Sequence, residues 1–142
     1  MSETEIEERL LPPYRTAVAS GVGAVMASFN IYEGIPMHAH KGLITGVLKE
    51  EMQFDGIMLS DWKGYSKFGE ADIINAGIDM VMAVDGDLEL FQKGLKKAVE
   101  DGDVSRERID DAVRRILRQK FRLGLFENPY PSETFIDSIG SQ

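Results

Sequence analysis

Polar side chains follow three apolar stretches of the chain, each at the point where a strand would end. They are Ser28 and Asn30 after the first stretch, Ser60 and Asp61 after the second, and Asp85 and Asp87 after the third. In parallel α/β folds the carboxyl ends of the strands form the site. These residues are therefore the first candidates for chemistry.

The run Ser60-Asp61-Trp62 is the most informative, because a carboxylate and a large aromatic side chain emerge together. A carboxylate can attack a sugar carbon, and an indole face can stack on a pyranose ring. The competing interpretation is structural: Asp61 would cap the following turn, a common role for Asp after a strand, and Trp62 would pack under a loop. The residues alone leave both interpretations open.

The elements that must position these residues alternate along the chain. Strands are predicted at residues 22–30, 54–60 and 78–84, and helices at 2–20 (interrupted at Pro12 and Pro13), 41–52, 70–75, 88–101 and 106–123. Strands that are apolar along their whole length, alternating with helices, indicate a parallel sheet covered by helices. The predicted fold class is α/β, a partial (β/α) barrel of the TIM type with about three parallel strands.

The number of strands limits this interpretation. A closed barrel of eight such units needs about 250 residues, and three parallel strands would leave two edges with unpaired backbone groups. The chain has 142 residues. We therefore expect a fragment of a larger barrel or a subunit of a split protein.

Composition argues against several partners. The net charge is −8, with 24 Asp and Glu against 16 Lys and Arg, so we expect neither nucleic acid nor an anionic membrane as a partner. The chain contains no cysteine, which excludes a disulfide framework and a thiolate metal site. The N-terminus is acidic and precedes no long apolar stretch, so we predict neither a signal peptide nor a membrane span, and localisation stays unassigned.

Two clusters could suggest a metal. His38 and His40 lie two residues apart, but a complete site would need carboxylates from elsewhere. Asp85, Asp87 and Glu89 lack the ligand spacing of an EF-hand and fit the start of a helix, where acidic side chains are favourable. We predict no metal and no cofactor.

Several blocks of the chain resemble a known family in their order and spacing. The blocks are VMASFN at residues 25–30, GIPM at 34–37, FDGI at 54–57, SDW at 60–62, AGIDM at 76–80 and the segment 114–130. They resemble glycoside hydrolase family 3, of the β-glucosidase or exo-β-glucanase type, and the resemblance covers nearly the whole chain. It implies the C-terminal portion of that family's (β/α)8 barrel domain.

The resemblance also implies roles for individual residues. Asp61 matches the catalytic nucleophile, which forms a covalent glycosyl-enzyme intermediate with retention of configuration. Trp62 matches a wall of the aglycone subsite, and Met26 and Phe29 match the floor of the glycone pocket. Many relatives have tyrosine at position 29, whose hydroxyl can hydrogen-bond the nucleophile, and His40 stands where exo-glucanase-like members usually have asparagine.

The implied organisation places residues 1–126 in the barrel domain and 127–142 in a linker toward a second domain. The family's acid/base and its other glycone-binding residues have no counterpart in this sequence. The implied function is retaining hydrolysis of terminal β-D-glucosidic bonds in β-glucosides or β-glucan oligosaccharides. This chain would supply the nucleophile, and the remaining part of the enzyme or a partner chain would supply the missing barrel half and the acid/base.

Two alternatives stay open at this point. The chain could be a noncatalytic carbohydrate-binding or assembly subunit that keeps half of a site for recognition. It could also belong to an unrelated barrel enzyme, such as a lyase or aldolase, with Asp61 as a general base.

Overall fold

Parallel strands form the centre of the protein. The computed structural model describes residues 2–67, 69–84 and 86–140. Strand β1 (Ala24–Met26) pairs in parallel with β4 (Ile57–Leu59), and a single parallel bridge joins Leu59 to Met80. Three successive β segments therefore run side by side, in the parallel arrangement that the sequence predicts.

The predicted third strand over residues 78–84 is wrong in extent, because only Met80 pairs with β4. Its ladder would continue with a hydrogen bond from the Met82 N–H to the backbone carbonyl of Ser60. In the structure the Met82 N–H instead donates to the side-chain Oγ of Ser60 at 2.8 Å. The Ser60 hydroxyl thus takes the place of the backbone acceptor, and the strand pairing ends at this point. The first two strands are also shorter than the predicted stretches.

The N-terminal helical run consists of α1 (Glu3–Glu5), the π-helical η1 (Ile6–Leu10) and α2 (Leu11–Ala19). The prolines of α2 lie in its first turn, where a missing N–H removes no helical hydrogen bond. The predicted interruption is therefore a change from π-helical to α-helical spacing.

The other predicted helices are confirmed. They are η3 (Gly42–Glu51, π-helical), α3 (Glu70–Ala76), α4 (Asp87–Glu100) and α5 (Arg106–Arg122). Short 3-10 turns that the sequence did not predict lie at η2 (Met37–Ala39), η4 (Gly64–Lys67) and η5 (Glu133–Ser138). Ser105 Oγ accepts the Arg108 N–H at 3.1 Å as the N-cap of α5. Gly77 ends α3 with a left-handed backbone at φ 119°.

One hairpin was not predicted. Strands β2 (Ile31–Tyr32) and β3 (Ile35–Pro36) pair antiparallel around a two-residue turn. Both turn residues have positive φ, 52° at Glu33 and 76° at Gly34, the geometry of a type I′ turn. The turn signal is weak in the sequence because glutamate, rather than asparagine or aspartate, precedes the glycine.

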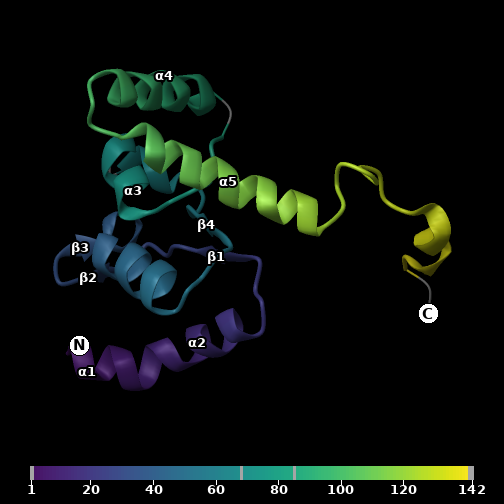
Figure 1. The fold of residues 1–142 in the computed structure, drawn as a ribbon, viewed down its shortest axis with the longest axis horizontal. Helices are drawn as coiled ribbons and strands as arrows, with labels where there is room; N and C mark the ends of the chain where they lie inside the picture. Colours follow the sequence, from purple (N-terminus) through teal and green to yellow (C-terminus); the bar gives the residue numbers. More distant parts are fainter. Residues whose placement is uncertain (1, 68, 85, 141–142) are drawn as a thin grey trace.

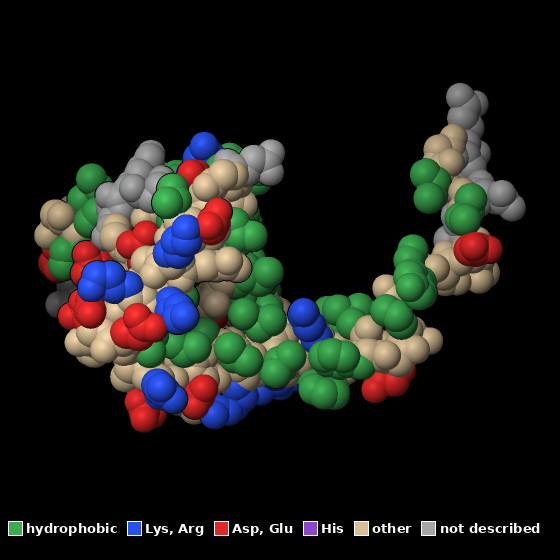
Figure 2. Space-filling model, turned by 90° about the horizontal axis from the view of Figure 1, so that it is seen from above, with side chains coloured by type: hydrophobic (Ala, Val, Ile, Leu, Met, Phe, Trp, Pro, Cys, Tyr) green, Lys and Arg blue, Asp and Glu red, His purple; other side chains and the backbone are tan. Residues whose placement is uncertain are grey.

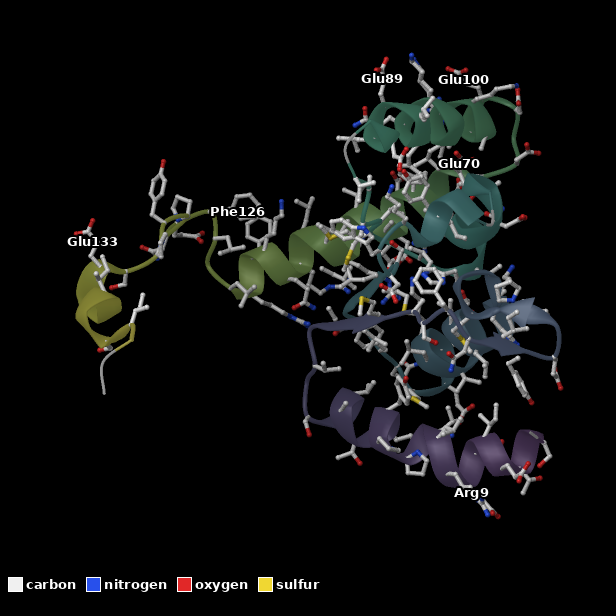
Figure 3. All side chains as sticks on the ribbon, turned by 180° about the vertical axis from the view of Figure 1, so that it is seen from behind. Arg9, Glu70, Glu89, Glu100, Phe126 and Glu133 are labelled. Carbon is white, nitrogen blue, oxygen red and sulfur yellow. The ribbon has the colours of Figure 1, made fainter. Side chains whose placement is uncertain are left out.

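Helices lie on both sides of the short sheet. The N-terminal run lies along one side, and α3, α4 and α5 lie on the other (Figure 1). The strands in the described part of the chain do not close a barrel. After α5 the backbone leads away from the body to η5, and the labelled side chains of Phe126 and Glu133 mark that path in Figure 3.

The core lies between the sheet and the helices, while α5 keeps an apolar face exposed. Phe54, Ile44, Ile73, Ile78 and Val104 are almost fully buried. Val113, Leu117 and Phe121 repeat every four residues along α5 and are 47%, 40% and 62% exposed. Figure 2 shows hydrophobic side chains gathered along this part of the molecule. On the outer side of α4, by contrast, Glu89 and Glu100 point away from the body (Figure 3).

A buried ion-pair network joins the start of the third β segment to η3 and α5. The carboxylate of Asp79 is fully buried, pairs with Lys49 Nζ at 2.7 Å and with Arg108, and accepts the Met58 N–H at 2.9 Å. Burial lowers the pKa of the Lys49 ammonium to about 8, although Asp79 acts in the opposite direction. Asp111 extends the network through Arg108 and Lys49.

Neither a membrane-spanning helix nor a metal cluster occurs in the part of the chain that the structure describes. Across these residues, no helix combines the length and apolar character that a membrane crossing requires. The same residues contain no group of three His, Cys, Asp or Glu side chains placed to hold a metal ion. Asp85 of the proposed acidic cluster lies outside the described residues.

Candidate active site

The backbone of Asp61 is fixed two residues after the end of β4. Its N–H donates to Nε2 of His38 at 3.0 Å, and its carbonyl accepts from Ser60 Oγ at 2.9 Å and from the Gly64 N–H at 3.0 Å. Ser60 and His38 are fully buried, whereas Asp61 is only partly buried. Asp61 is therefore partly exposed, while hydrogen bonds to the buried side chains of His38 and Ser60 fix its backbone.

The Asp61 side chain does not cap the next turn. Its Oδ1 accepts the N–H of the adjacent Trp62 at 2.6 Å. An N-cap would instead take an N–H two or three residues on, but the Lys63 N–H donates to the Met82 carbonyl and the Gly64 N–H to the Asp61 carbonyl. Within the described ranges, the hydrogen bonds to this carboxylate engage Oδ1 only. The carboxylate therefore binds the first N–H of the following turn and makes no N-cap hydrogen bond two or three residues on within the described ranges.

The loop after Asp61 contains a strained residue. Lys63 has φ 55°, a left-handed conformation that is uncommon for a residue other than glycine. Its ammonium lies 3.8 Å from the carboxylate of Asp87 at the start of α4. Strain of this kind clusters at functional sites, so it supports the interpretation of the loop as part of one.

The other predicted site residues lie at the same edge of the sheet, but they are not equally close to Asp61. Trp62 adjoins it and is 63% exposed, which contradicts the interpretation of Trp62 as a side chain packed under a loop. The Phe29 ring lies 5.1 Å from the His38 ring, measured between centroids, so Phe29 reaches Asp61 through that histidine. Met26 lies opposite Leu59 and lines an apolar cavity of about 170 Å³ beside the N-terminal helices.

Two histidines have clear local roles that the sequence did not reveal. His38 accepts the Asp61 N–H, a contact between residues 23 positions apart. His40 Nδ1 accepts the Leu43 N–H at 3.2 Å where the η3 helix starts, the bond that an asparagine side chain makes as an N-cap. The two imidazoles thus serve separate backbone groups.

The fold and site together define an α/β protein with a carboxylate and an exposed indole at the carboxyl ends of parallel strands. Residues 1–119 match the family model described as "Glycosyl hydrolase family 3 N terminal domain". The chain therefore belongs to glycosyl hydrolase family 3, whose enzymes contain a TIM barrel.

Individual relatives agree with this assignment. The chain is 37% identical to a lysosomal beta glucosidase of Dictyostelium discoideum, over 97% of this chain and 18% of that protein. Among solved structures it is similar to the exo-1,3/1,4-beta-glucanase of a Pseudoalteromonas species, with a TM-score of 0.83, 39% identity and coverage of 89% and 16% of the two chains. It is also similar to the beta-glucosidase of Listeria innocua in complex with isofagomine, with a TM-score of 0.85, 34% identity and coverage of 94% and 20%. The chain thus spans about a fifth of the length of these relatives.

Proposed function

We propose that this chain is the nucleophile-bearing part of a retaining β-glucosidase or exo-β-glucanase, and that Asp61 is the nucleophile. Asp61 attacks the anomeric carbon and displaces the aglycone, giving a glycosyl-enzyme ester that water then hydrolyses. The acid/base, the other glycone contacts and the remaining barrel strands come from the rest of the enzyme or from a partner chain.

The main support for this proposal is that hydrogen bonds fix the backbone of Asp61 while its carboxylate stays partly exposed. Three hydrogen bonds hold that backbone, and a fourth, from the Trp62 N–H, orients the carboxylate. Preorganisation of this kind lowers the cost of bringing a nucleophile onto its target. Phe29 has no hydroxyl for the carboxylate, and the backbone of Trp62 provides a hydrogen bond instead.

The substrate class is inferred from the relatives. The Listeria innocua enzyme has been solved with glucose and with gluconolactone, and its D270A mutant with laminaribiose. We therefore propose β-linked glucosides and short β-glucans as substrates. Trp62, next to the nucleophile and exposed, would contact the sugar or aryl group on the leaving side.

A trapping experiment tests the nucleophile directly. The assembled active enzyme, treated with a 2-deoxy-2-fluoro-glucoside that carries a good leaving group, should accumulate a glycosyl ester on the peptide that contains Asp61. Peptide mass spectrometry locates the label. Asp61→Asn should abolish labelling, whereas Asp72→Asn, at an exposed position on α3, should preserve it. Glucose binding without labelling or turnover would favour the noncatalytic subunit, and a label on another residue would reject Asp61.

The role of Trp62 can be tested separately. Trp62→Ala should raise KM for laminaribiose and aryl glucosides by about 2- to 10-fold, because a stacked aromatic contact is worth roughly 0.5–1.5 kcal/mol. Inhibition by free glucose should change little, since glucose occupies only the glycone side. Steady-state kinetics on both ligands decide the matter. Tyr130→Ala, which removes an aromatic ring 85% exposed in the C-terminal segment, is the control. Equal effects on glucose and on the longer substrates would remove Trp62 from the leaving-side subsite.

A further inference from the structure

His38 occupies the space directly beneath the Asp61 loop. It lies in η2, is fully buried, and accepts the Asp61 N–H through Nε2 at 3.0 Å. The fit against Gly64 is so close that a Cβ on that glycine would lie 2.2 Å from the same Nε2. The imidazole therefore supports both Asp61 and Gly64, the two ends of the turn that presents the carboxylate.

The same ring connects two strand ends. Phe29, in the segment after β1, lies with its ring centroid 5.1 Å from that of His38 and its plane tilted by 36°. His38 also accepts the N–H of Asp61, two residues after the end of β4. A shift of the imidazole would therefore change the position of Asp61 relative to the end of β1.

The hydrogen bond also requires one chemical form of the ring. A nitrogen that accepts an N–H must carry a lone pair, so Nε2 is unprotonated and the ring proton of the neutral imidazole is on Nδ1. To hold Asp61, residue 38 must therefore supply a hydrogen-bond acceptor at the position of Nε2 as well as fill the volume of the ring.

We infer that His38 is a positioning residue for the nucleophile: its Nε2 fixes the backbone of Asp61 and thereby the point from which the carboxylate attacks. This inference rests on the proposed function of Asp61. Its consequence is kinetic. A nucleophile displaced by about 1 Å can lose roughly 10²-fold in rate, while substrate contacts made elsewhere persist.

Three variants of the assembled enzyme separate positioning from packing. His38→Met replaces the ring with an unbranched side chain of similar size whose thioether sulfur is only a weak acceptor, and kcat should fall by about 10- to 100-fold with KM changed less than about threefold. His38→Gln returns an acceptor oxygen near the Nε2 position and should recover most of kcat. Gly64→Ala keeps the histidine but pushes it away from Asp61, so it should lower kcat as His38→Met does. Gly46→Ala, where a Cβ meets nothing within 4 Å, is the matched control.

Rates are expressed per functional site, counted by titration with the fluorinated glucoside, so that partly unfolded protein does not enter kcat. A slow rate per titrated site in His38→Met and Gly64→Ala, restored in His38→Gln, supports the inference. Wild-type kcat per site in His38→Met and Gly64→Ala overturns it, as does a His38→Gln enzyme as slow as His38→Met. The peptide that carries the trapped sugar in the wild type tests Asp61 independently, so failure of the proposed function is recognised by a label elsewhere.

Discussion

Replacing Asp61 by alanine should abolish glucosidase activity in the assembled enzyme, with kcat reduced by roughly 10⁴-fold or more. The alanine variant has no atom that can form the glycosyl ester, and it opens a space next to the anomeric carbon. Sodium azide should therefore restore part of the turnover of an activated aryl glucoside and give a glycosyl azide of inverted configuration. Release of the aryl group measures the rate, and NMR of the product gives its anomeric configuration.

The matched control is Asp72→Ala, which removes an exposed carboxylate from the first turn of α3 and should leave kcat unchanged. If Asp61 were only a cap, its loss would cost about 0.5–2 kcal/mol of stability with the chemistry intact. A folded Asp61→Ala enzyme with ordinary turnover would thus contradict the nucleophile assignment. An azide product of retained configuration would contradict the mechanism.

The helices were predictable from the sequence because their signals are local. The apolar spacing of α4 and α5, the N-cap at Ser105 and the positive φ of Gly77 and Gly124 all agree with the pattern. The carboxyl end of β4 was also correctly identified as the place where Asp61 and Trp62 emerge. These features depend on residues within a few positions of one another.

Features that depend on distant contacts were not predictable in the same way. The third strand ends early because the Ser60 hydroxyl, 22 residues from Met82, takes its N–H. The contact between His38 and Asp61 likewise joins residues 23 positions apart, so no periodicity in the sequence signals it. A lone buried histidine has the same sequence pattern whether it fills space or holds a neighbouring loop.

The most destabilising substitution is expected at Asp79, away from the carboxylate that we propose reacts. Its side chain has no exposed surface and binds Lys49, Arg108 and the Met58 N–H. Removing one member of a buried ion-pair network costs about 3–5 kcal/mol, because the charges left behind remain buried without compensation. Asp79→Ala should therefore lower the free energy of unfolding by about that amount, measured by urea unfolding of the assembled enzyme.

Two further substitutions show whether burial causes this effect. Asp55 forms an exposed ion pair with Arg122, with side chains 54% and 52% exposed, and Asp55→Ala should cost about 1 kcal/mol or less. Lys49→Met removes a cation that burial already disfavours, since its pKa is lowered to about 8, and it leaves Asp79 paired with Arg108. Its cost should therefore be clearly smaller than that of Asp79→Ala. If all three substitutions had equal effects, the buried carboxylate would not be the centre of the network, and the junction of η3, α5 and the third β segment would depend on apolar packing instead.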